Sequence, residues 1–138
     1  MRGAWLLVAL ASCQADNSPI MFPGSNCLSC HQAGGAADSR IWTLAGTVFN
    51  DPQATVREGV ENAQVLVTDT AGKELTLLTN LAGNFYTAEA LTFPVQVSVQ
   101  KGNTRIGMDG HPALGACNTC HNDPRSNEAI GRIFFKGP

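Results

Sequence analysis

The feature that most constrains this chain is a five-residue pattern that occurs twice. "CLSCH" starts at Cys27 and "CNTCH" starts at Cys117, so that two cysteines three positions apart are each time followed directly by a histidine. This spacing matches the C-x-x-C-H signature of c-type haem attachment, in which two thiols bond the vinyl groups on one edge of the porphyrin and the imidazole ligates the iron. The repeated pattern predicts two covalently bound haem c groups, attached through Cys27, Cys30, Cys117 and Cys120.

Three other interpretations of the paired cysteines compete with haem. A structural zinc site uses four cysteines, but its pairs usually lie about 15–20 residues apart, and here a domain-sized segment separates them. Disulfides within each pair, or between the pairs, are open to an exported chain. A thioredoxin-like redox pair needs a strand–helix context that the Gly- and Pro-rich flanks do not offer. None of the three explains a histidine after both pairs, which favours haem.

The predicted haem irons each need axial ligands. The attachment histidines, His31 and His121, are the expected proximal ligands. The occupant of the sixth position decides the chemistry, because an open iron binds peroxide or a gas while a filled one only changes its oxidation state.

Three residues are candidates for the sixth positions. Met21 lies six residues before Cys27, and an extended run of that length spans roughly 20 Å, enough to reach the far face of a haem. Met108 precedes Cys117 by nine residues, and His111 precedes it by six. Reach alone does not discriminate between Met108 and His111. The two methionines occupy similar places before similar motifs, which favours Met21 and Met108 over His111.

The segment between the two motifs has the pattern of a small β-sandwich. Valines alternate with polar residues in "ENAQVLVTD" and "PVQVSVQ", and "LAGTVF" at residues 44–49 supplies a further strand. Gly-containing turns in "TDTAGKELTLL" and "TNLAGNFY" predict that successive strands pair as antiparallel hairpins. The alternating residues expected to face the core are Ala63, Val65, Val67, Val95, Val97 and Val99.

The first residues have the layout of a secretory signal. Arg2 precedes an apolar run that ends in small residues, and "LASC" at residues 10–13 resembles the lipobox of bacterial lipoproteins. Cys13 would then become the lipidated first residue of the mature chain, followed by a polar tether. The alternative is a buried N-terminal strand with a free cysteine.

Charge argues against nucleic acid as a partner, and hydropathy argues against a membrane-spanning helix. The formal net charge is −2 and the nine Lys and Arg residues are scattered, so no basic stripe is available to replace phosphate counterions on nucleic acid. No stretch approaches the roughly 20 apolar residues that a membrane-spanning helix needs. Contact with a membrane is therefore expected only through a lipid anchor.

The middle of the chain resembles the carboxypeptidase regulatory-like family of transthyretin-like sandwiches, through "AGTVF", "GVENAQVLVTDTAGKELTLLT" and "NLAGNFY". With "MFPGSNCLSCH" before it and "GACNTCH" and a late "GRI" after it, the whole chain resembles bacterial di-haem cytochrome c lipoproteins that carry such a sandwich between two haem-binding segments. The resemblance implies His/Met ligation with Met21 and Met108, and His111 is extra to its pattern.

These observations together predict a mainly β protein, a small Ig/transthyretin-like antiparallel sandwich flanked by two irregular haem-binding segments. We expect an exported electron carrier, not an enzyme, anchored as an outer-membrane lipoprotein that faces the periplasm or the extracellular space. Its partners would be other redox proteins, chiefly cytochromes, and assembly into an oligomer or filament is left open. The alternative is a haem peroxidase or gas sensor with one open iron. The predicted segments are a signal (1–12), a lipidated tether (13–19), a first haem-binding segment (20–40), the sandwich (41–106) and a second haem-binding segment (107–138).

Overall fold

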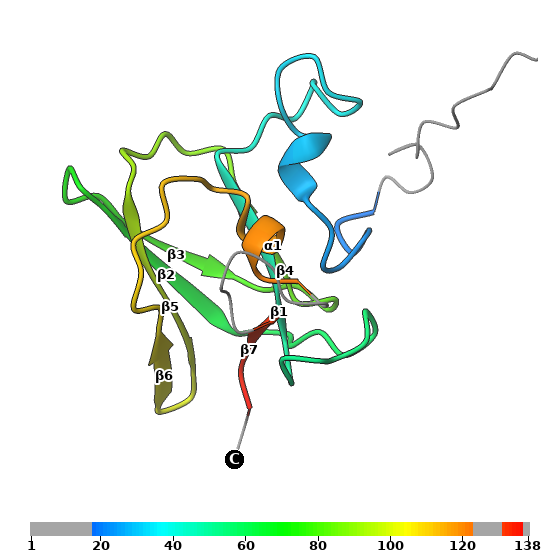
Figure 1. Cartoon of the computed structure of the whole chain (residues 1–138), viewed down its shortest axis with the longest axis vertical. Helices are drawn as coiled ribbons and strands as arrows, with labels where there is room; N and C mark the ends of the chain where they lie inside the picture. The colour runs from blue at the N-terminus through cyan, green and yellow to red at the C-terminus, as the bar shows by residue number, and fades with distance from the viewer. Residues whose placement is uncertain (1–17, 123–130, 137–138) are drawn as a thin grey trace, which may run out of the picture.

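The regular secondary structure in the described part of the chain consists of two β-sheets and two short helical turns (Figure 1). The structure, a computed structural model, describes residues 18–122 and 131–136, so the predicted signal, Cys13 and nearly all of the tether lie outside it. The strand order is β4-β1-β7 in one sheet and β3-β2-β5-β6 in the other. The elements are η1 (Cys27–Ser29), β1 (Leu44–Phe49), β2 (Gln64–Asp69), β3 (Glu74–Leu78), β4 (Asn84–Thr87), β5 (Val95–Lys101), β6 (Thr104–Gly107), α1 (Cys117–Cys120) and β7 (Ile133–Phe134). The predicted mainly β sandwich class is confirmed.

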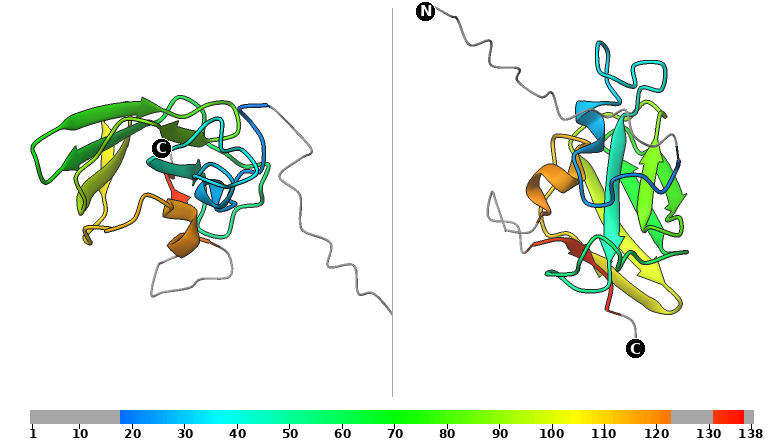
Figure 2. Two further views of the ribbon diagram at one scale, coloured as in Figure 1. Left: turned by 90° about the horizontal axis from the view of Figure 1, so that it is seen from above. Right: turned by 90° about the vertical axis from the view of Figure 1, so that its right-hand side faces the viewer.

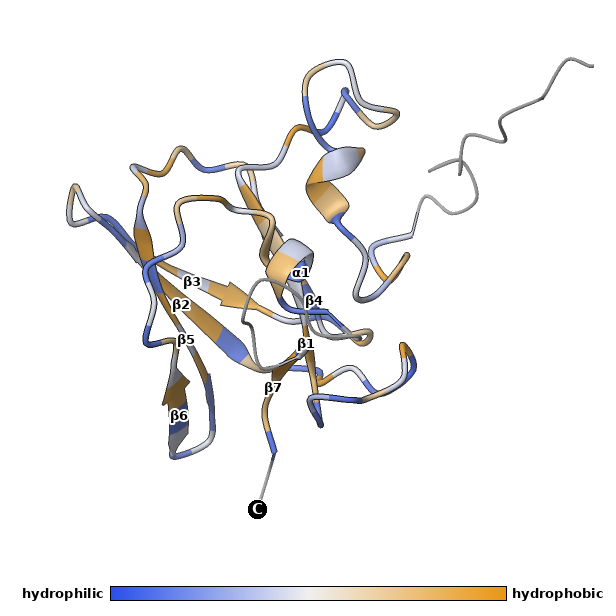
Figure 3. Cartoon of the chain, in the orientation of Figure 1, coloured by the Kyte–Doolittle hydropathy of each residue, from blue (hydrophilic) through white to orange (hydrophobic). Residues whose placement is uncertain are grey.

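The core lies where the alternating residues of the sequence predict it. β2 pairs with β5 in antiparallel register, with Val65 opposite Val99 and Val67 opposite Val97. Val65 and Val67 are at most 1% exposed, and Val97 is half-buried. Side chains of β1 and β4 close the core from the other sheet, and apolar residues concentrate along β2, β3 and β5 (Figure 3). The buried cluster consists of Leu44, Val48, Ala63, Val65, Val67, Phe85, Val95, Val99 and Phe135.

One of the two predicted hairpins is correct and the other is wrong. β2 and β3 pair as an antiparallel hairpin through the turn in "TDTAGKELTLL". β3 and β4, on either side of "TNLAGN", instead lie in different sheets, and β4 pairs with β1. The Asn80 side-chain oxygen accepts the N–H groups of Ala82 and Asn84, which holds a tight turn. Because Val48 of β1 donates to the Gly83 carbonyl, the chain leaving this turn crosses to the other sheet.

β1 is the central element, because every one of its residues is buried. It pairs antiparallel with β4 on one edge and parallel with β7 on the other. Leu44 and Val48 pack into the core, while both helical turns contact the same strand. Figure 2 shows η1 and α1 beside β1 on the same side of the sandwich. The predicted second haem-binding segment (107–138) also supplies β7, so the sandwich and its flanking segments are interwoven.

Neither helical turn within residues 18–122 and 131–136 has the length and apolar character required to cross a membrane.

A glycine in β1 tests this packing. A Cβ added at Gly46 would lie 2.6 Å from Phe85 Cζ and 2.9 Å from Cys117 Cβ, between the core and the second motif. We expect Gly46→Ala to lower the free energy of unfolding by about 1–3 kcal/mol, as overpacking of a filled site does. Urea denaturation measures it.

The matched control is Gly107→Ala at the end of β6, where an added Cβ meets no atom within 4 Å. Its stability should change by less than about 0.5 kcal/mol. Equal stabilities for the two variants would contradict the close approach of α1 to β1.

Candidate haem-binding sites

The first motif folds as one helical turn that is closed by the loop after it. Within η1, the N–H groups of Cys30 and His31 both bond the Cys27 carbonyl, at 3.2 and 3.0 Å. The chain then folds back, and Trp42 donates its N–H to the His31 carbonyl at 3.0 Å. The turn and the returning loop therefore fix the backbone of His31 on both sides, directly before β1 begins.

The ring of His31 is held with one nitrogen free. Its Nδ1 lies 2.8 Å from the Arg40 carbonyl oxygen, and because a carbonyl only accepts, Nδ1 carries the proton. Nε2 then keeps its lone pair, which is the arrangement found in metal-binding histidines. His31 is 6% exposed, and its ring stacks on Trp42 with the centroids 3.4 Å apart. Trp42 stacks in turn on Tyr86 at 4.1 Å, so two aromatic rings support the imidazole plane.

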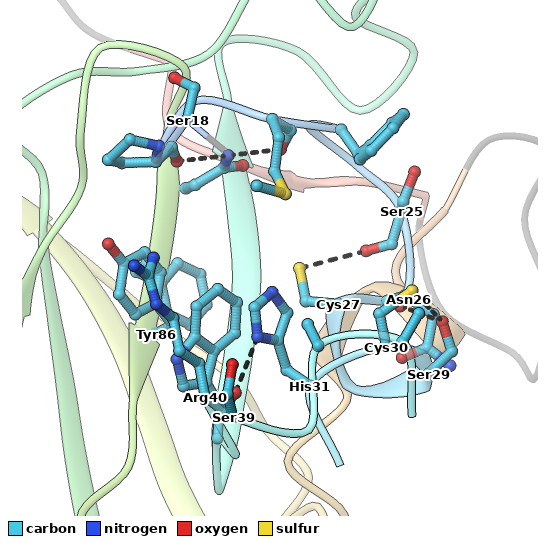
Figure 4. A pocket seen from close by; sticks show the side chains of 18 residues that line it. Ser18, Ser25, Asn26, Cys27, Ser29, Cys30, His31, Ser39, Arg40 and Tyr86 are labelled. Atoms are coloured by element: carbon cyan, nitrogen blue, oxygen red, sulfur yellow. Dashed lines mark hydrogen bonds between the residues drawn. The ribbon is translucent and has the colours of Figure 1, made fainter. Parts of the chain in front are cut away.

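A cavity of about 810 Å³ opens beside this imidazole. Its size falls within the roughly 300–1,000 Å³ of cofactor sites. Figure 4 shows Cys27 and His31 together on one side of the opening, with the segment that starts at Ser18 crossing opposite them. The ring nitrogen of His31 that is not bonded to Arg40 points into the open space. Met21, Cys27, Cys30 and His31 all line this cavity, so the structure places Met21, one of the two methionine candidates, beside the first motif.

The second motif repeats the arrangement of the histidine. α1 forms one turn, and His121 donates its N–H to the Cys117 carbonyl at 3.0 Å. His121 Nδ1 lies 3.1 Å from the Gly131 carbonyl oxygen, so in the neutral imidazole Nε2 is again the nitrogen that keeps its lone pair. Gly131 has φ +94°, and a Cβ there would lie 2.7 Å from the Pro52 carbonyl oxygen. The glycine of "GRI" thus allows the C-terminal segment to reach His121.

A buried hydrogen-bond network joins the two motifs through β1. Asn118, inside the second motif and 4% exposed, accepts the Thr47 N–H at 3.1 Å and donates to the Ser25 carbonyl at 2.9 Å. The Thr47 hydroxyl accepts from Gly24 N–H at 2.9 Å and donates to Asn84 at 2.9 Å. One strand residue therefore contacts the approach to the first motif, the second motif and β4. Two segments far apart in sequence are thereby held side by side.

The cysteine thiols are not those of a redox-active pair. Burial raises the pKa of Cys27, and burial, with a further contribution from the nearby Cys27 thiol, raises the pKa of Cys117 to about 12. Reactive Cys-x-x-Cys thiols need the opposite, a stabilised thiolate. In addition, no group of three or more His, Cys, Asp or Glu residues in the described ranges is arranged to hold a metal ion.

The structure also bears on the alternatives in which the paired cysteines form disulfides. Cys27, Cys117 and Cys120 form no disulfide bond, so none of them is bonded to Cys30. The structure therefore contains neither a disulfide within either pair nor one between the pairs.

The candidates for the sixth positions differ in placement. The Asn84 amide donates to the Met21 carbonyl at 3.0 Å, which ties the Met21 segment to β4 at the first cavity. Met108 is 38% exposed in the segment after β6, where its N–H bonds the Val97 carbonyl, and His111 is also exposed. The structure brings Met21 to the first motif, and neither Met108 nor His111 lines the cavity beside His31.

Sequence reasoning missed the residues that support the ligands. Trp42, Tyr86 and the Arg40 carbonyl surround His31, and Thr47 and Asn118 connect the motifs. Asn118 occupies one of the two variable positions of C-x-x-C-H, which the motif leaves unspecified. Its burial follows only from the approach of α1 to β1, which no local pattern encodes.

Comparisons with known proteins identify no relative of this chain: no family model, no curated protein and no solved structure matches it significantly.

The network joining the motifs can be tested by substitution. Asn118→Ala removes the partners of the Thr47 N–H and the Ser25 carbonyl, and leaving buried polar groups unpaired costs about 1–3 kcal/mol each. We expect a loss of roughly 2–4 kcal/mol in the free energy of unfolding. Denaturant titration followed by circular dichroism measures it. Asn103→Ala, in the exposed turn between β5 and β6, should leave stability unchanged; a similar loss there would show that the effect is not specific to the network.

Proposed function

We propose that this chain is an exported di-haem c-type cytochrome that carries electrons in the periplasm or at the outer cell surface. The observation that supports it best is the shared geometry of the two motifs. Each folds as a single helical turn, and each ends in a histidine whose Nδ1 is bonded to a backbone carbonyl, at 2.8 and 3.1 Å, leaving Nε2 for iron. The C-x-x-C-H pattern does not require those carbonyls, so their presence is independent support.

Each group of residues has a distinct part in this proposal. The haems, when bound, supply one-electron transfer at iron. The four paired cysteines would form the thioethers, and His31 and His121 would ligate the irons. Because a thioether forms from a free thiol, the disulfide at Cys30 must be reduced before attachment. The stacked Trp42 limits tilting of the His31 ring, and the cavity of about 810 Å³ lies directly beside this ring.

The contact between the motifs supports electron transfer within one chain. Asn118 and Ser25 are directly hydrogen-bonded, and the thiols of Cys27 and Cys117 lie close enough to raise the pKa of Cys117. Haems attached at these cysteines would share one side of β1. An electron entering at one haem would therefore have a short path to the other.

The cellular setting follows from the sequence alone. Cys13, the lipidation candidate, lies outside the described residues, and the outer-membrane anchor stays a prediction. The proposed partners are other redox proteins, chiefly cytochromes, and filament assembly is left open. The resemblance to di-haem cytochrome c lipoproteins supports this setting.

The second candidate function, a haem peroxidase or gas sensor, is favoured by one observation. Met108 and His111 are both exposed, whereas Met21 lines the cavity beside His31. If neither reaches the second iron, that iron has an open position for a gas or peroxide.

Covalent attachment is tested by mass. Produced with a cytochrome c maturation system, the chain should gain the mass of two haems, and a Cys117→Ala/Cys120→Ala variant should gain the mass of one. Intact-protein mass spectrometry makes the measurement, with the chain produced without that system as the control. A mass equal to the unmodified chain, or to the chain with zinc, would overturn the proposal.

Carbon monoxide binding to the reduced protein tests the distal ligands. We expect no binding to the native protein, because methionine fills both sixth positions. Met21→Ala should open one haem and Met108→Ala the other, while His111→Ala leaves both closed. Absorption spectroscopy follows the reaction. If His111→Ala opens a haem and Met108→Ala has no effect, that haem is bis-histidine, and binding to the native protein would favour the sensor or peroxidase.

A further inference from the structure

The cavity of the first motif has an uneven distribution of charge. Among the described residues that line it, Arg40 is the single one with a charged side chain. Its backbone carbonyl accepts a hydrogen bond from His31 Nδ1–H, whereas its guanidinium has no hydrogen bond or ion pair with any described residue. The backbone of Arg40 thus has a defined role in the site, while its cation is left for another partner.

The position of this cation matches the shape of a haem. The vinyl groups lie on one edge of the porphyrin, and the two propionate carboxylates lie on the opposite edge. In Figure 4, Cys27, which would bond a vinyl group, lies on one side of His31, and the Arg40 side chain lies on the other side, beside Tyr86. A haem attached at Cys27 and ligated by His31 would therefore direct its propionates toward Arg40.

We infer that the guanidinium of Arg40 binds a propionate of the first haem. This inference rests on the proposed function and adds a binding residue that the C-x-x-C-H motif does not specify. Arginine suits the role because its planar fork of N–H donors pairs with a carboxylate through two hydrogen bonds. Arg40 would then have two roles at the first site: its carbonyl orients the His31 imidazole, and its side chain binds a propionate.

Substitution can separate the side chain from the backbone. Arg40→Gln removes the cation and keeps the carbonyl that orients His31. A cation beside the haem favours the ferrous over the ferric state, so we expect the midpoint potential of one of the two haems to fall. Arg40→Lys should restore most of the potential. Arg57→Gln, an exposed arginine that does not line the cavity, is the matched control and should leave both potentials unchanged.

The experiment is a spectroelectrochemical titration of the matured full chain, with resonance Raman spectra of the propionate bending mode as a second readout. A lowered potential and a shifted propionate band in Arg40→Gln alone support the inference, as does loss of the first haem in Arg40→Gln but not in Arg40→Lys. Unchanged potentials and an unchanged band in Arg40→Gln, with both haems present by mass, overturn the inference and leave the proposed function standing. Absence of haem from the native matured chain overturns both.

Discussion

The hydrogen bonds of Thr47 hold the rest of this structure together. Thr47 is fully buried at the centre of β1, and its hydroxyl and N–H bind Gly24, Asn84 and Asn118. Buried polar groups are costly unless paired, so each of these partners must be in place for β1 to keep both faces covered. The approach to the first motif, the second motif and β4 are therefore fixed to one strand by a single connected network. The sandwich serves as the scaffold, and its central strand determines how close the two motifs lie.

This arrangement explains how a small chain can position two similar sites. Each motif is only one turn of helix and makes few contacts within itself. Its histidine is oriented by a carbonyl from elsewhere, Arg40 in the first case and Gly131 in the second. Both carbonyls belong to segments that lead directly into strands of the three-stranded sheet, β1 and β7. The geometry of the two imidazoles therefore depends on the formation of that sheet.

The sequence predicted local patterns well and spatial relations poorly. Val65 and Val67 face the core as their alternation indicates, because the side-chain period of a strand is a local property. The "TNLAGN" turn was wrongly predicted to join a hairpin, since turn chemistry does not specify which sheet receives the next strand. Cys27, Cys30 and His31 could be named from motif spacing, whereas the placement of Met21 beside them depends on tertiary structure. The proximity of Cys27 to Cys117, and the burial of Asn118, arise from tertiary packing that no spacing encodes.

The central claim is that both motifs hold haem through thioether bonds on one scaffold. The most direct measurement uses the chain purified after production with a cytochrome c maturation system. The protein is first extracted with acidified acetone, which removes haem that is not covalently bound. It is then denatured in alkaline pyridine and reduced, and its absorption spectrum is recorded. The account predicts the spectrum of thioether-linked haem, at two haems per chain, retained with the protein through the extraction. A colourless protein, or haem that is removed completely by the solvent, would contradict it.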